Sequence, residues 1–119
     1  MKPHKNLDAW KLSFQFVKDV YIATASFPVE EKFGLVSQIR RAAVSVPVNI
    51  AEGAARKSKK EFIRFLYIAE GSVSELDTLL ELSLALHFFS EELTRKLLLE
   101  LETISKRIFG LIKKVSSEL

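Results

Sequence analysis

Apolar residues recur at steps of three and four along four segments of the chain, which is the spacing of one face of an α-helix. The three later stripes are Val36, Ile39, Ala43, Val46, Ile50 and Gly53, then Phe62, Leu66, Ala69, Val73, Leu76 and Leu80, then Leu93, Leu97, Leu101, Ile104, Ile108, Leu111 and Val115. The pattern predicts helices over residues 7–25, 30–56, 59–88 and 91–117. No segment shows sustained period-2 alternation, so strands are not expected.

The first helical segment carries two adjoining apolar faces. The stripe expected to face the core is Leu7, Trp10, Phe14, Val17 and Tyr21, and the neighbouring face holds Leu12, Phe16, Val20 and Ala23. One bundle core needs an apolar stripe only about 100° wide on each helix, and the third and fourth segments are also wider than that. Because contiguous excess apolar surface is typical of a subunit interface, we expect a homo-oligomer with closed cyclic symmetry.

Capping and breaking residues separate the four segments. Asn6 can cap the first helix, and Ser58 with Glu61 forms a capping box at the start of the third. Ser90 precedes two acidic residues at the start of the fourth, and Pro28 breaks the chain after the first. Short loops between amphipathic helices imply antiparallel neighbours. The expected fold is all-α, a single domain over residues 1–119 forming an up-down-up-down four-helix bundle.

Pro47 lies inside the second predicted helix. It cannot donate a hydrogen bond to the Ala43 carbonyl, so we expect a kink near Pro47 and a carbonyl that needs another donor. Ser45, Asn49 or a water molecule could supply that donor.

Composition supports a soluble globular domain. The chain has 119 residues, is 48% hydrophobic, and has a net charge of +3 and no cysteine. The absence of cysteine excludes disulfides and thiolate metal sites and suits the cytoplasm. The charged N-terminal stretch lacks the apolar core of a secretory signal, and no apolar run is long enough to cross a bilayer. A mildly basic protein can bind nucleic acid, but this charge does not require it.

A line of polar residues follows the second helix. Its members, at steps of four, four, three and four, are Arg41, Ser45, Asn49, Glu52 and Arg56. Arg41 and Glu52 lie about 16 Å apart along the helix and cannot pair with each other there. Possible partners on the third helix are Glu70, Glu75 and Asp77. The line is interpreted either as a structural network, at an interface between helices or subunits, or as a ligand contact.

Positive charge is concentrated around the turn between the second and third helices. The candidate nucleic-acid-binding residues are Arg40, Arg41, Arg56, Lys57, Lys59, Lys60 and Arg64. Most of them adjoin the N-terminus of the third helix, where free N–H groups favour anions. A phosphate backbone is the matching partner chemically, and the alternative is a solvated turn that keeps the protein soluble. Aromatic residues do not interleave with these cations, so base-specific readout is not expected.

Catalytic and metal-binding patterns are absent from the sequence. The two histidines, His4 and His87, are far apart, and neither belongs to the Glu-x-x-His pattern of di-iron bundles. There is no phosphate-binding glycine loop. We therefore expect no enzyme activity, no metal and no cofactor.

Two sequence blocks resemble a known family. The blocks FGLVSQIRRAAVSVPVNIAEG, from Phe33 to Gly53, and IAEGSVSEL, from Ile68 to Leu76, are similar to those of the bacterial 23S rRNA intervening-sequence protein family, and LDAWKLSFQFVKDVY fits its opening helix. The matching motif residues are Arg40, Arg41, Ser45, Asn49, Glu52, Gly53, Arg56, Glu70, Gly71 and Glu75, none of them catalytic in the family.

The resemblance implies a left-handed up-down bundle that assembles as a ring, a homopentamer. It also implies a relation in fold to the nucleic-acid-binding accessory protein of diversity-generating retroelements. The first functional hypothesis is therefore a non-catalytic ring that binds RNA or DNA phosphates through its basic turn. The second is a homo-oligomeric assembly module that contacts other proteins and binds no nucleic acid.

Overall fold

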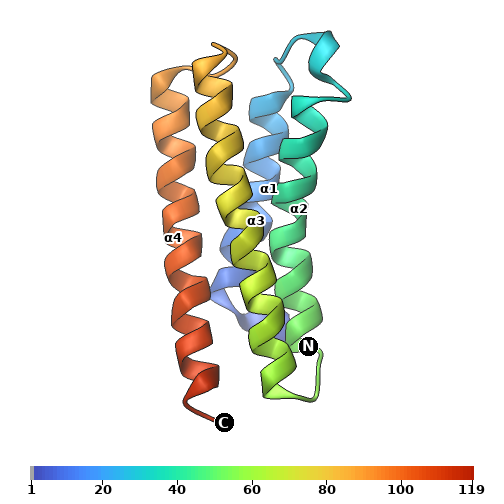
Figure 1. The fold of residues 1–119 in the computed structure, drawn as a ribbon, viewed down its shortest axis with the longest axis vertical. Coiled ribbons are helices and arrows are strands. Elements are labelled where there is room, and N and C mark those ends of the chain that lie inside the picture. Colours follow the sequence, from blue (N-terminus) through green and yellow to red (C-terminus); the bar gives the residue numbers. More distant parts are fainter. Residues whose placement is uncertain (1) are drawn as a thin grey trace.

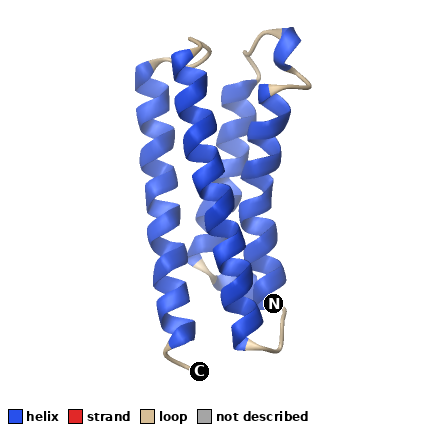
Figure 2. Cartoon of the chain, viewed as in Figure 1, coloured by secondary structure: helices blue, strands red, loops and turns tan. Residues whose placement is uncertain are grey.

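Four long helices make up most of the chain. In the computed structural model, which describes residues 2–119, they are α1 (Asp8–Thr24), α2 (Leu35–Ala54), α3 (Lys59–Ala85) and α4 (Glu91–Ser116). Two short 3-10 helices, η1 (Pro3–Asn6) and η2 (Val29–Glu31), precede α1 and α2. No strand occurs within the described range (Figure 2). The predicted all-α class with four helices is confirmed.

The helices lie side by side along the 46 Å long axis of the molecule (Figure 1). Figure 1 shows the α1–α2 and α3–α4 connections at one end of the bundle. The α2–α3 turn and both chain termini lie at the other end. α2 packs most extensively against α3, and contacts between α1 and α4 close the circle of helices.

The predicted stripes of α2, α3 and α4 form the hydrophobic core. Their central members, among them Ile39, Ile50, Leu66, Leu80 and Ile108, are completely buried. A fully buried leucine or isoleucine contributes about 1.5–3 kcal/mol relative to an exposed one, so these stripes supply much of the driving force for folding.

α1 uses a different face from the one predicted. Its buried residues are Ala9, Ser13, Phe16, Val20 and Thr24, whereas Phe14 and Tyr21 of the predicted stripe are about half exposed. Small side chains allow α1 to lie close to its neighbours, and the buried hydroxyls of Ser13 and Thr24 donate to carbonyls of their own helix. Hydrogen-bonded hydroxyls carry little burial cost, so the face with fewer large apolar residues can be the buried one.

The start of α2 was predicted five residues too early, at residue 30 instead of Leu35. Residues 29–31 form η2 instead, and Gly34 interrupts the chain before α2. The Glu31 carboxylate then accepts a hydrogen bond from the Leu35 N–H at 3.3 Å. At α1 the predicted Asn6 cap is also wrong, because Leu7 is the N-cap residue and makes no side-chain cap bond.

α3 ends at Ala85, three residues before its predicted end. His87 adopts a left-handed conformation with φ 64°, and the N–H groups of Phe88 and Phe89 both donate to the Ser83 carbonyl. The two phenylalanine rings then pack against Phe27 from the α1–α2 connection, with ring centroids 5.2 and 4.9 Å apart. Burial of this aromatic cluster outweighs one further helical turn.

Pro47 is buried within α2. The Asn49 amide, one of the donors considered for the Ala43 carbonyl, donates instead to the carbonyl and the hydroxyl of Ser45, at 2.8 and 2.9 Å. The kink at Pro47 remains a prediction.

Candidate nucleic-acid interface

The α2–α3 turn brings five of the candidate cations together. They are Arg56, Lys57, Lys59, Lys60 and Arg64, all exposed, and are called the basic turn below. Gly53 lets α2 and α3 approach closely just before the turn, because a Cβ built on it would lie 2.7 Å from the Phe65 Cβ. The Ser58 side chain then accepts a hydrogen bond from the Glu61 N–H, so this predicted cap is confirmed.

Two arginines of the basic turn are held against an aromatic ring. The guanidinium carbons of Arg56 and Arg64 lie 4.9 and 5.5 Å from the centroid of Phe65. Arg64 also pairs with Glu61 at 3.2 Å, an exposed pair that contributes little stability. Cation–π contacts orient these guanidinium groups without neutralising their charge.

The lysines of the basic turn differ in how they are paired. Lys59 contacts the Glu118 carboxylate at 3.4 Å, which ties the turn to the end of α4. Lys57 and Lys60 have no carboxylate within ion-pair distance among residues 2–119. Lys59 and Lys60 also occupy the first turn of α3, where the helix dipole disfavours cations. The fold gains little from these charges, so they remain available to an external anion.

Further cations lie at the same end of the bundle. Lys2 directly precedes η1 and Lys5 lies within it. Lys113 and Lys114 occupy the last turn of α4. Figure 1 shows both termini and the α2–α3 turn at this end. We call the nine residues Lys2, Lys5, Arg56, Lys57, Lys59, Lys60, Arg64, Lys113 and Lys114 the basic end. Sequence reasoning missed four of them, although the alternating helix directions of an up-down bundle would place them there.

Arg40 and Arg41 do not join the basic end, because they lie about 20 Å further along α2. Arg40 bridges to α1: its Nε donates to Thr24 Oγ1 at 3.0 Å, and its guanidinium lies 4.3 Å from the Tyr21 ring centroid. Arg41 is exposed. Their proximity in sequence to the basic turn is therefore lost in the folded chain.

The predicted polar line along α2 is only partly a network. Ser45 and Asn49 are hydrogen-bonded to each other, and Ser72 of α3 donates to the Ser45 hydroxyl at 2.8 Å. Sequence reasoning missed Ser72, yet Ser45 and Ser72 lie almost equally far from Ser58 on either side of the turn. Counting outward from the turn of an antiparallel hairpin would have paired them. Arg41 and Glu52 are exposed and join no ion pair within residues 2–119.

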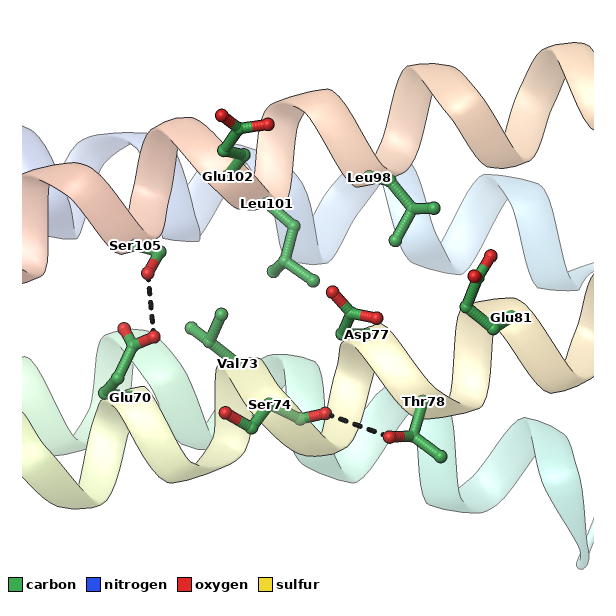
Figure 3. A pocket seen from close by; sticks show the side chains of 10 residues that line it. All are labelled: Glu70, Val73, Ser74, Asp77, Thr78, Glu81, Leu98, Leu101, Glu102 and Ser105. Atoms are coloured by element: carbon green, nitrogen blue, oxygen red, sulfur yellow. Dashed lines mark hydrogen bonds between the residues drawn. The ribbon is translucent and has the colours of Figure 1, made fainter.

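The three predicted acidic partners on α3 face α4 or solvent, and Asp77 lines the groove between α3 and α4. Glu70 points toward α4, where its Oε1 accepts a hydrogen bond from Ser105 Oγ at 2.7 Å (Figure 3). Its Oε2 is buried without a hydrogen-bond partner among the described residues. Burial raises the pKa of Glu70, and the Ser105 bond offsets only part of that rise. Glu75 is exposed.

Glu100 of α4 lies near another carboxyl group, Asp19 of α1. Burial raises the pKa of Glu100, and the nearby Asp19 carboxylate raises it further, while Lys96 lowers it. Gln15 Nε2 donates to Asp19 Oδ1 at 3.2 Å. A carboxyl whose pKa is raised by folding destabilises the native state when ionised, and that cost disappears as pH falls through the raised pKa toward the ordinary value of 4.5.

Replacing Glu100 by glutamine should therefore raise the melting temperature by a few degrees at pH 7. The difference from the unaltered protein should shrink on acidification and vanish below the ordinary glutamate pKa, because both side chains are then neutral. Thermal unfolding followed by circular dichroism at pH 7 and pH 4 measures the difference in melting temperature between the two proteins. Glu30 is an exposed carboxylate in η2, so Glu30→Gln should change the melting temperature little at either pH. An equal rise in the melting temperature of this control would contradict the raised pKa of Glu100.

Neither metal binding nor membrane insertion finds support in the described residues. Within residues 2–119 no three histidine or acidic side chains converge as metal ligands. None of the helices there is both long and apolar enough to span a bilayer. His4 makes an edge-to-face contact with Trp10, with ring centroids 5.0 Å apart, so it is part of the N-terminal packing.

Comparisons with known proteins agree with this architecture. The family model described as 23S rRNA-intervening sequence protein matches residues 5–110. No curated protein matches the chain. A crystal structure from Bacteroides thetaiotaomicron, described as a protein of unknown function from the S23 ribosomal protein family, superposes with a TM-score of 0.82 at 24% identity. The match covers 95% of this chain and 99% of that one, and it shows a shared fold.

Proposed function

The chain belongs to the 23S rRNA-intervening sequence protein family, and we propose that it is a non-catalytic, ring-forming bundle that binds the phosphate backbone of RNA or DNA. The contact surface is the basic end, and the protein acts in the cytoplasm. The observation that carries the proposal is the gathering of nine cations at this end from both termini and the α2–α3 turn.

The distribution of charge along the bundle supports this surface. The basic end holds nine cations against the side-chain carboxylates Asp8, Glu52, Glu61 and Glu118, of which Glu61 pairs with Arg64 and Glu118 with Lys59. The opposite end carries the acidic pairs Glu30–Glu31 and Glu91–Glu92. A polyanion is therefore attracted to one end and repelled by the other, which orients its approach.

Ring formation would multiply this charge. Copies arranged around an axis parallel to the bundle would present their basic ends on one side of the ring and summate their fields. Five copies are the number expected from the family resemblance. A continuous basic rim would then contact several phosphates of one nucleic acid at once, which raises avidity beyond that of a single subunit.

A titration against structured RNA tests the proposal. Fluorescence anisotropy of a labelled stem-loop should show binding with micromolar or tighter affinity at 50 mM salt. The affinity should fall at least about tenfold at 200 mM salt, since cations that bind phosphates release counterions. A duplex DNA of the same length should bind with similar salt dependence because contacts to the backbone carry no base readout.

Absence of micromolar binding at low salt, or binding that ignores salt, would contradict the proposal. The alternative is then a homo-oligomeric assembly module without nucleic-acid binding. It is supported by the exposed apolar side chains of α1 and α2, such as Phe14, Val44 and Val48, which a monomer leaves in water.

A further inference from the structure

One surface of α2 is both apolar and positively charged. An open hollow of about 720 Å³ runs along it, and the charged residues lining the hollow are Lys32, Arg40 and Arg41, with no carboxylate among them. Val44 and Val48 continue this surface into a smaller apolar hollow of about 320 Å³ beside Phe14. We call the combined surface the α2 face.

A groove of opposite charge lies between α3 and α4. It measures about 510 Å³, and its charged lining residues are Glu70, Asp77, Glu81 and Glu102, with no cation among them. Figure 3 shows Asp77 and Glu81 on α3 directed toward α4, with Leu101 of α4 pointing into the same groove. We call this surface the acidic groove.

The two surfaces complement each other in several respects. Each carries a single sign of charge, and each combines its charges with apolar area. They have no lining residue in common, and they lie on different helices, so the two surfaces do not meet within one chain. Glu102 already pairs with Lys106 of its own helix at 3.3 Å, whereas Asp77 and Glu81 make no ion pair within residues 2–119. A surface that fits a different surface of an identical copy forms a head-to-tail contact, and such contacts close into a ring when the rotation allows.

We infer that the α2 face of one copy docks in the acidic groove of the next, and that this heterologous contact builds the ring. The inference deepens the ring formation proposed above by assigning its two contact surfaces. The occupant of both surfaces is a second copy of this chain. Arg41 is the central cation of the contact, because Arg40 is already held by Thr24 and Tyr21 within its own chain.

The heights of the charges along the bundle agree with such a ring. Rotation about an axis parallel to the bundle keeps each residue at its own height. Measured from the α2–α3 turn, Arg41 lies about 20 Å up α2 and Asp77 about 27 Å up α3. An arginine side chain can span the remaining difference. The same rotation leaves the basic end uncovered, so the contact and nucleic-acid binding are compatible.

Two charge reversals test the contact. Arg41→Glu alters only the α2 face, and Asp77→Arg alters only the acidic groove. Each variant alone should raise the protein concentration needed for assembly by about 100-fold or more, because like charges oppose each other at every contact. Mass photometry and sedimentation velocity measure the mass. Lys113→Glu, a reversal outside both surfaces, should keep the mass of the unaltered protein.

Mixing the two variants is the decisive step. Each still carries one unaltered surface, so the mixture should form complexes containing both variants where neither assembles alone. The inference is overturned if either variant keeps its full mass, or if the mixture stays monomeric while both variants melt like the unaltered protein. It is also overturned if Arg41→Glu lowers RNA affinity and leaves the mass unchanged. A monomeric unaltered protein would instead refute ring formation itself.

Discussion

Replacing Gly53 by alanine should lower the free energy of unfolding by up to about 2 kcal/mol, although alanine is the better helix former. The new methyl group would lie 2.7 Å from the Phe65 Cβ and 3.0 Å from the Phe62 ring. A Cβ cannot swing away, so α2 and α3 must separate where they are closest. Overpacking of this kind costs about 1–3 kcal/mol, against a helix-propensity gain of about 1 kcal/mol.

The matched substitutions are Gly71→Ala and Gly110→Ala. Both glycines lie within helices, and an added Cβ would meet no atom within 4 Å at either position. These variants should gain about 0.5–1 kcal/mol, because only the intrinsic helix preference changes. Urea unfolding of the three variants under identical conditions measures the difference. A Gly53→Ala variant as stable as the other two would show that the close approach of α2 and α3 is not needed.

Removing three charges from the basic end should weaken nucleic-acid binding by about 10- to 100-fold at low salt. The variant combines Arg56→Gln, Lys57→Gln and Lys60→Gln, which lie in the basic turn and make no ion pair within residues 2–119. Each lost phosphate contact reduces the salt slope by about 0.9 for duplex DNA. Anisotropy titrations at several salt concentrations give both quantities.

The control removes the same charge from elsewhere on the bundle. Lys18→Gln, Arg95→Gln and Lys96→Gln change three exposed cations outside the basic end, and Lys18 lies about 15 Å along α1 from its first residue. This variant should keep the affinity within about threefold, because exposed charges more than a Debye length of about 10 Å from the ligand are largely screened. Equal losses in the two variants would indicate a response to net charge and would contradict a localised site.

Some of the hydrogen bonds and packing contacts of the bundle could be predicted from the sequence, and others could not. The Ser58 and Ser90 caps depend only on residues within one turn, and both are present. The Ser45–Ser72 bond could have been reached by counting from the α2–α3 turn. The burial of Ser13 in place of Phe14 could not, because it depends on how closely α1 approaches its neighbours. That distance is set by the packing of all four helices together.

The sequence by itself determined the number of helices, their approximate bounds and the core stripes of α2, α3 and α4. These features follow from periodicity and capping, which act within a few residues. Only the tertiary structure decided which face of α1 is buried, that Arg40 is held by Thr24 of α1, and that Glu70 accepts a hydrogen bond from Ser105 of α4. The physical reason is that a helix fixes the spacing of its own side chains, whereas neighbours from distant segments are chosen by the packing of the whole bundle.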